Sequence, residues 1–173
     1  LIATNNPAVA ETARMLRKHG GKNKYHNEML GYNSRLDALQ AAILRVKLKN
    51  VDEYNQKRRA IARRYNELLS DVSQVYPPNW IDGHVYHQCT VRIVSGKRDA
   101  VRNCLAEQGI TSKVYYPVPC HQLPVYRDYE VALPVAEQMA EEVLSLPIWP
   151  QMEIPKQQKI TTTIGLIIRN AMQ

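Results

Sequence analysis

The chain reads Leu30-Gly31-Tyr32-Asn33-Ser34-Arg35-Leu36-Asp37 and then runs directly into an apolar segment with helical spacing, residues 39–44. Asn33, Ser34 and Arg35 therefore stand at the start of a predicted helix. Backbone N–H groups at a helix start, together with Asn and Arg side chains, attract phosphates and carboxylates. Ser34 as a helix N-cap beside a solvated Arg35 explains the same residues. The residues by themselves leave both interpretations open, although plain caps are commoner than anion sites.

Helical spacing continues well beyond this start. One apolar stripe steps by three or four residues over a span of roughly 35 residues, and it comprises Leu36, Leu39, Ile43, Val46, Ile61, Tyr65 and Leu68. A second stripe of Leu44, Leu48 and Val51 gives the first half of this helix two apolar sides. Such a helix is expected to lie between two bodies, either two domains or two subunits, with a bend near Asn50.

The remaining segments predict a small α/β layer. Residues 1–4 are typical of the end of a strand, and Asn6 followed by Pro7 predicts a helix that ends at Gly20-Gly21. Farther on, the patterns predict strands at 85–93, 110–116 and 144–149, and helices at 99–108, from Pro134 and from Ile154. Strands and helices that alternate in this way form a sheet covered by helices.

Composition narrows the class of protein. The chain has 173 residues, of which 45% are hydrophobic, so a packed core is possible. A net charge of +7 favours an anionic partner, although a solvated basic surface is the commoner cause. Three cysteines, no basic leader and no apolar run near the ~20 residues of a membrane span predict a reduced, cytoplasmic protein without a membrane partner. The opening on Leu1 suggests a piece of a longer protein.

A second informative stretch is rich in proline, tyrosine and histidine. It reads Tyr115-Tyr116-Pro117-Val118-Pro119-Cys120-His121-Gln122-Leu123-Pro124-Val125-Tyr126. Proline fixes backbone angles and stiffens a loop. Tyrosine rings stack on sugars and bases, and tyrosine and histidine form hydrogen bonds. A binding loop for a polar, ring-shaped ligand and a structural turn with packed tyrosines are equally consistent with these residues.

Other chemistries are disfavoured. His84 and His87 would lie on opposite faces of a strand, which is poor geometry for a metal site with Cys120 and His121. Cys120 and His121 are sequence neighbours whose side chains point apart, so they do not make a nucleophile and its base. The basic run 57–64 is more typical of a solvated helix face than of a nucleic-acid interface. We therefore predict no metal ligand, no catalytic residue and no nucleic-acid partner.

Taken together, these stretches resemble the C-terminal half of a pyridoxal-phosphate (PLP) sugar aminotransferase of the DegT/DnrJ/EryC1/StrS family. The resemblance implies the C-terminal portion of a fold-type-I aminotransferase, with a long connecting helix and a small α/β domain whose short sheet is covered by helices. Residues 1–50 would be a remnant of the large cofactor domain and the start of the connecting helix, and residues 51–173 would be the small domain. The matching motifs include Gly31-Tyr32-Asn33-Ser34-Arg35, His84-Val85-Tyr86-His87, Tyr116-Pro117-Val118-Pro119, Pro124-Val125-Tyr126 and Leu144-Ser145-Leu146-Pro147.

The same resemblance implies a function. The parent enzyme would be a homodimer that transfers an amino group, expected to come from glutamate, to a keto-sugar attached to a nucleotide. The amide of Asn33 would contact the PLP phosphate in the neighbouring subunit. The implied substrate contacts are Arg35, Tyr115, Tyr116, His121 and Tyr126, although many relatives have His in place of Tyr115.

Besides Tyr115, a second departure from the family pattern concerns the lysine of the cofactor. The lysine that binds the cofactor normally lies in a motif of the type Ser-Phe-His-x-x-Lys, and these residues contain no such motif. The segment alone is therefore expected to be inactive. The alternative is a non-catalytic regulatory or dimerisation module derived from the same family.

Overall fold

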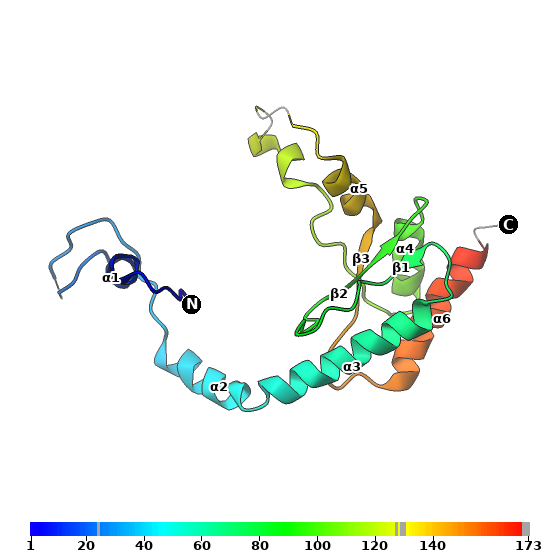
Figure 1. The fold of residues 1–173 in the computed structure, drawn as a ribbon, viewed down its shortest axis with the longest axis horizontal. Helices are drawn as coiled ribbons and strands as arrows, with labels where there is room; N and C mark the ends of the chain where they lie inside the picture. Colours follow the sequence, from blue (N-terminus) through cyan, green and yellow to red (C-terminus); the bar gives the residue numbers. More distant parts are fainter. Residues whose placement is uncertain (24, 127, 129–130, 171–173) are drawn as a thin grey trace. The chain divides into compact units, whose positions relative to one another are not determined.

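A computed structural model describes residues 1–23, 25–126, 128 and 131–170 (Figure 1). The chain divides into two compact units, Leu1–Asn50 and Val51–Gln173. Each unit is described by itself below. In the part of the chain that the structure describes, no helix combines the length and the apolar character that a membrane span requires.

The first unit contains the helices α1 (Pro7–Leu16) and α2 (Ala38–Leu48). The Asn6 side chain caps α1 by accepting hydrogen bonds from the N–H groups of Ala8 and Val9 at 2.9 and 3.3 Å, and Pro7 occupies the first turn. This predicted start is confirmed. The helix ends at Leu16 rather than at Gly20, and the predicted strand at residues 1–4 is wrong because that segment has no strand partner.

The predicted cap of the second helix is also wrong. The cap is Asp37, whose Oδ1 accepts a hydrogen bond from the Leu39 N–H at 2.8 Å. Ser34 instead lies beside the chain that follows α1, where its N–H donates to the Arg17 carbonyl at 3.1 Å. The helix begins after this contact, at Ala38.

The predicted single long helix is two helices. Helix α2 ends at Leu48, and α3 (Val51–Leu69) begins the second unit. Between them, the Asn50 N–H donates to the Lys47 carbonyl at 3.1 Å, a contact three residues back rather than four. The regular helical ladder is thus interrupted at the place where the sequence predicted a bend.

The second unit is a mixed α/β fold, as predicted. Strands β1 (Val75–Tyr76), β2 (Cys89–Ile93) and β3 (Val143–Leu146) form an antiparallel sheet in the order β1-β2-β3. Besides α3, its helices are α4 (Arg98–Glu107), α5 (Pro134–Glu142) and α6 (Ile154–Asn170), with short 3₁₀ turns at η1 (Cys120–Gln122) and η2 (Pro124–Tyr126).

One face of the sheet forms the core. Cys89, Val91 and Ile93 alternate into a cluster with apolar residues of α3, α4 and α6, whereas Thr90 and Arg92 stand on the other face and are only half-buried. Burial raises the pKa of Cys89 to about 12, so its thiol stays neutral and acts as a small apolar side chain. Helix α5 extends beyond the end of the sheet (Figure 1).

Two predicted strands are shorter in the structure. The strand expected at 85–93 begins only at Cys89, because Tyr86 has a φ of 48° and its N–H is bonded to Nδ1 of His84 at 3.0 Å. The segment 110–116 makes one isolated bridge, Lys113 to Ser145, because Tyr116 has a φ of 58° and leads into Pro117. The strand expected at 144–149 runs from Val143 to Leu146.

Candidate functional site

The Asn33 segment is held by a backbone crossing inside the first unit. The chain just after α1 runs beside residues 28–34. The Tyr32 N–H donates to the Leu16 carbonyl at 2.7 Å, and the Ser34 N–H donates to the Arg17 carbonyl at 3.1 Å. These contacts fix the backbone on both sides of Asn33, although the side chains around it are exposed.

Two glycines allow this crossing. A Cβ at Gly31 would lie 2.1 Å from the Gly20 nitrogen, and a Cβ at Gly20 would lie 1.8 Å from the Met29 carbonyl oxygen. Gly20 also has a φ of +82°, which favours glycine. The two backbone segments approach so closely that no side chain fits between them.

Asn33 and Arg35 lie together at the end of this crossing. Asn33 forms a bridge with Lys18, and its Oδ1 accepts a hydrogen bond from Nε of Arg35 at 3.1 Å. Within the described residues, the Asn33 Nδ2 group and the remaining guanidinium N–H groups of Arg35 make no hydrogen bond, and both side chains are exposed. Together they are a donor set suited to an anion.

Arg35 also lines a cationic hollow of about 480 Å³. The Lys22 ammonium forms an ion pair with Glu11, which raises the pKa of Lys22 through a side-chain hydrogen bond and through charge attraction. The donor chemistry of this hollow fits a phosphate or another anion. Its walls are Lys18, His19, Gly21, Lys22, Asn23, Tyr25, Asn27 and Arg35.

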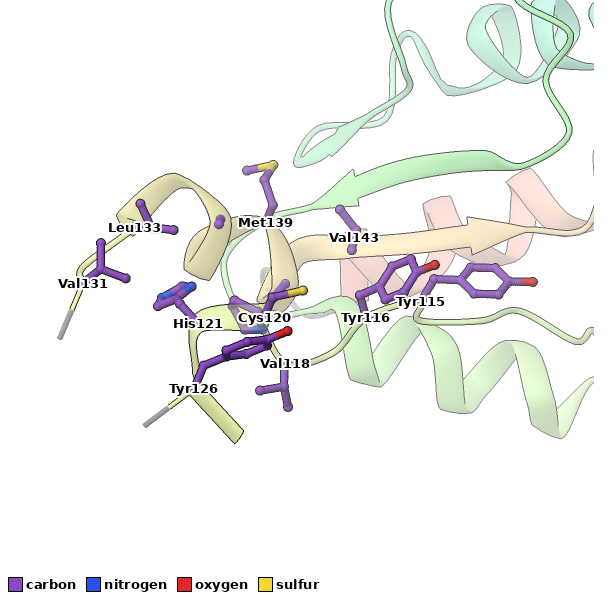
Figure 2. Close-up of a pocket in the computed structure, with 13 residues that line it drawn as sticks. Tyr115, Tyr116, Val118, Cys120, His121, Tyr126, Val131, Leu133, Met139 and Val143 are labelled. Carbon is purple, nitrogen blue, oxygen red and sulfur yellow. The ribbon is translucent and has the colours of Figure 1, made fainter. Parts of the chain in front are cut away.

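A larger hollow of about 750 Å³ lies in the second unit (Figure 2). All four predicted substrate residues of the proline-rich stretch contribute to it: Tyr115, Tyr116, His121 and Tyr126. Arg35 belongs to the other unit. The rest of the wall is apolar apart from the thiol of Cys120, and consists of Val118, Pro119, Cys120, Val131, Leu133, Ala136, Met139, Ala140 and Val143.

The apolar wall was not predicted as part of a site. Val135, Met139 and Val143 follow Pro134 at helical spacing, and such spacing predicts a stripe packed in the core. In the structure, Met139 and Val143 line the hollow, while Val135, from the same stripe, is 71% exposed. The stripe was a usable signal, but the sequence does not show that a loop, rather than the core, faces it.

His121 is held by a carboxylate at the start of α5. Its Nε2 lies 2.9 Å from Oε1 of Glu137, and the same oxygen accepts a hydrogen bond from the Leu133 N–H at 3.0 Å. The His121 side chain is only 9% exposed. The hydrogen bond from His121, and then that from the Leu133 N–H, lower the pKa of Glu137. This carboxylate therefore ties η1 to the first turn of α5 and fixes the His121 ring beside the hollow.

We expect Glu137→Gln to weaken this connection in a pH-dependent way. Because the folded-state pKa of Glu137 is lowered from 4.5, its ionised form stabilises the fold above about 4.5, and that contribution disappears as the pH falls through the lowered pKa. Hydrogen exchange at the Leu133 amide should be faster in the variant at pH 7 and indistinguishable from the unaltered chain in strong acid. Glu141→Gln, at an exposed site on the same helix, is the control. A difference that persists in strong acid would contradict this role.

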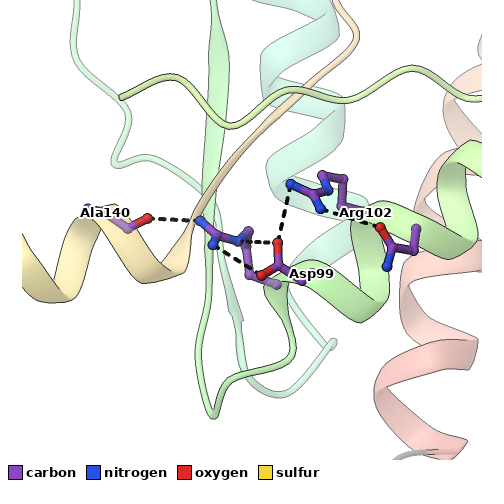
Figure 3. Close-up of polar contacts among 5 residues, drawn as sticks. Asp99, Arg102 and Ala140 are labelled. Carbon is purple, nitrogen blue, oxygen red and sulfur yellow. Dashed lines mark hydrogen bonds and ion pairs between the residues drawn. The ribbon is translucent and has the colours of Figure 1, made fainter. Parts of the chain in front are cut away.

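The other end of α5 is held by arginines. Nε and Nη2 of Arg92 donate to Oε2 of Glu142 at 2.9 and 2.7 Å. Nη1 of Arg98 donates to the Ala140 carbonyl at 2.8 Å, and its Nε pairs with Asp99 at 2.9 Å (Figure 3). Charged donors at a helix C-terminus satisfy carbonyl groups that lack a partner within the helix. Helix α5, which forms part of the apolar wall of the hollow, is thus held by polar contacts at both of its ends.

No metal centre is built from these residues. Within residues 1–23, 25–126, 128 and 131–170, no group of three or more His, Cys, Asp or Glu side chains has an arrangement that could hold a metal ion. The Cys120 thiol is exposed and unpaired by any disulfide, and Cys89 is buried.

Comparison with known sequences identifies relatives along nearly the whole chain. The chain is 43% identical over 177 residues to a pleiotropic regulatory protein of Geobacillus stearothermophilus, with 98% of this chain and 47% of that protein aligned. It is 39% identical over 168 residues to dTDP-3-amino-3,4,6-trideoxy-alpha-D-glucose transaminase of Streptomyces venezuelae, with 94% and 44% aligned. The chain thus spans about half the length of these relatives.

Solved structures have the same fold. DesV of Streptomyces venezuelae superposes with a TM-score of 0.87 and 38% identity, covering 96% of this chain and 46% of DesV. NtdA of Bacillus subtilis, solved with bound pyridoxamine phosphate (PMP), superposes with a TM-score of 0.88 and 27% identity, covering 96% and 41%. The model of the DegT/DnrJ/EryC1/StrS aminotransferase family matches residues 1–165, which confirms the resemblance drawn from the motifs. The chain therefore belongs to the DegT/DnrJ/EryC1/StrS aminotransferase family.

Proposed function

We propose that this chain is the C-terminal part of a PLP-dependent aminotransferase that transfers an amino group, with glutamate as donor, to a keto-sugar attached to a nucleotide. Relatives named as nucleotide-sugar transaminases support the reaction class. The observation that carries the proposal is the Asn33–Arg35 pair, held by backbone contacts beside a cationic hollow.

In this proposal, the first unit binds the cofactor phosphate. The Nδ2 group of Asn33 donates to a phosphate oxygen, and Arg35 and Lys18 supply positive charge around it. PLP, when bound, supplies the electron sink for amino transfer. These residues bind and orient, and none of them is assigned a catalytic role. The lysine that binds the cofactor covalently would belong to a segment outside the chain.

The second unit binds the sugar substrate. Tyr115, Tyr116 and Tyr126 line the 750 Å³ hollow, and a sugar packs its C–H face on aromatic rings. His121 is fixed by Glu137 and offers its remaining ring nitrogen for a hydrogen bond. The rings and the histidine together select a ring-shaped ligand with few but defined polar contacts.

The proposal includes a homodimer. Helix α2 has no buried residue. Its apolar side chains Leu39, Val46 and Leu48 are 73%, 65% and 69% exposed. Apolar residues gathered on one exposed helix are typical of an interaction surface. A second copy of the protein that covers α2 would also bring the Asn33 segment to the neighbouring subunit, as the resemblance implies.

The proposal is tested with the protein translated from the complete reading frame that contains Leu1 to Gln173. That protein should show the visible absorbance of bound PLP and transfer an amino group from glutamate to a dTDP-linked keto-sugar. Asn33→Ala should weaken PLP binding about tenfold or more, because it removes a charge-assisted hydrogen bond. Asn66→Ala, in the second unit, is the matched control, since Asn66 donates to the Pro78 carbonyl and lines neither hollow.

Two results would refute the proposal. One is turnover by residues 1–173 alone, since the lysine is assigned to another segment. The other is PLP affinity that is unchanged in Asn33→Ala.

A regulatory role is the second candidate. The observation that favours it is the similarity to the Geobacillus stearothermophilus relative, which is named a pleiotropic regulatory protein. A complete reading frame whose product has no cofactor-binding lysine motif, forms dimers and binds no PLP would support this role against the enzyme.

A further inference from the structure

A row of polar side chains crosses the sheet on the face opposite the core. The hydroxyl oxygens of Thr90 on β2 and Ser145 on β3 lie 2.7 Å apart. Lys113 extends the row, because its N–H donates to the Ser145 carbonyl at 3.0 Å and its carbonyl accepts from the Ser145 N–H at 2.8 Å. Directly paired antiparallel residues place their side chains on the same face. Lys113 therefore rises from the same face as the two hydroxyls.

This row opens into a second hollow of about 250 Å³ in the same unit. No Asp or Glu is among its lining residues. Within the described part of the chain, the Lys113 ammonium and the His87 ring make no hydrogen bond or ion pair. The lining residues are His87, Gln88, Thr111, Lys113, Tyr115, Ser145, Leu146, Pro147 and Ile148.

A single solvated lysine would need no explanation. Here three donors from two segments line one hollow: His87 precedes β2, and Lys113 and Tyr115 follow α4. Such a set of donors, without a carboxylate to neutralise it, is suited to an anion.

Tyr115 connects this hollow to the larger one. It lines both the polar hollow of about 250 Å³ and the apolar hollow of about 750 Å³. One ligand that fills both would have a ring for the apolar hollow and an anionic group for the polar hollow. A nucleotide-linked sugar has this division, because its diphosphate stands between two rings.

We propose that Lys113, together with His87 and the Tyr115 hydroxyl, binds the diphosphate of the nucleotide-linked substrate while a ring of that substrate lies in the larger hollow. The identity of the ligand rests on the proposed function, whereas the anion site rests on the geometry alone. The site is exposed, so salt should weaken its binding of the diphosphate.

The test uses the chain with three probes: dTDP, inorganic pyrophosphate, and thymidine, which has no phosphate. Calorimetric titration should give a dissociation constant about tenfold higher for dTDP and for pyrophosphate in Lys113→Met. Thymidine binding should be unchanged. Lys113→Arg, which keeps the charge, should retain dTDP affinity within about threefold.

Lys159→Met is the matched control. Lys159 is exposed on α6 and lines neither hollow of the second unit. Its replacement by methionine removes the same single positive charge as Lys113→Met. The dTDP affinity of Lys159→Met should stay within about twofold of the unaltered chain. Far-UV circular dichroism establishes that each variant is folded.

The outcomes separate this inference from the proposed function. Equal weakening in Lys113→Met and Lys159→Met, or no binding of dTDP and pyrophosphate by the unaltered chain, overturns the anion site. If the complete enzyme transfers amino groups but Lys113→Met binds dTDP normally, this inference fails and the proposed function stands. If Lys113 is needed for pyrophosphate binding but the complete protein transfers no amino group, the anion site stands and the proposed function fails.

Discussion

Gly31→Ala should disrupt the backbone crossing that holds Asn33. The new Cβ would lie 2.1 Å from the Gly20 nitrogen and 2.5 Å from the His19 carbonyl carbon. These are backbone atoms, so no side-chain rotation relieves the contact, and the two segments must separate. We expect a local cost of about 3 kcal/mol, at the upper end of the effects of overpacking.

Hydrogen exchange measures this effect directly. The amides of Tyr32 and Ser34, which donate to the Leu16 and Arg17 carbonyls, should lose their protection. If Asn33 binds the PLP phosphate as proposed, Gly31→Ala should also weaken PLP binding in the complete protein, because Asn33 loses its support. Protected Tyr32 and Ser34 amides in the variant would show that the crossing does not depend on Gly31.

Gly165→Ala is the control for this substitution. Gly165 lies inside α6, and a Cβ there would meet its nearest atoms, on the flexible Arg169 side chain, at 3.5 Å. Because alanine favours a helix interior more than glycine does, this variant should be neutral or more stable by up to about 1 kcal/mol. The same chemical change thus has opposite expected effects at the two sites.

Leu69→Ala should have the largest effect on the second unit. Leu69 is 0% exposed in the last turn of α3 and belongs to the core cluster under the sheet. Deleting a fully buried leucine side chain costs about 3 kcal/mol, from lost burial and from the cavity that remains. For a unit of this size, the midpoint of thermal unfolding should fall by roughly 10 °C.

The neighbouring Leu68 gives a matched comparison. It lies in the same helical turn but is 36% exposed. The change in helix propensity is identical, so the difference between Leu69→Ala and Leu68→Ala isolates burial. Leu68→Ala should cost less than about 1 kcal/mol. Equal losses in the two variants would mean that α3 does not face the sheet in the orientation described.

Several parts of the fold could be predicted from local residues. Asn6 and Pro7 mark the start of α1 because the amide accepts from the first free N–H groups, and the structure confirms it. The alternation of Cys89, Val91 and Ile93 identifies the buried face of β2, because side chains alternate along a strand. The helices from Pro134 and Ile154 also begin where predicted.

The predictions for Ser34 and for residues 110–116 are wrong because contacts between distant backbone segments decide the local structure there. Ser34 has a good capping side chain, but in the structure it lies beside Arg17, to whose carbonyl its N–H donates, and Asp37 caps the helix. Residues 110–116 have strand-like residues, but only Lys113 meets β3 because Tyr116 turns the chain away. Neither contact leaves a signal in the local pattern, because each depends on a partner far along the chain.

The candidate sites divide in the same way. The donors around Asn33 and Arg35, and the tyrosines before and after the prolines, can be read from residue types alone, as can the family. Which of these groups lie together in the folded chain cannot be read from residue types. The hollow beside Tyr115 exists because α5 places Met139 opposite the loop, and Glu137 holds His121 there. The position of Lys113 beside Ser145 depends on a single bridge between segments about 30 residues apart. Local chemistry therefore determines which groups are available, whereas long-range backbone pairing and packing decide which of them meet, because those contacts form only once the chain has folded.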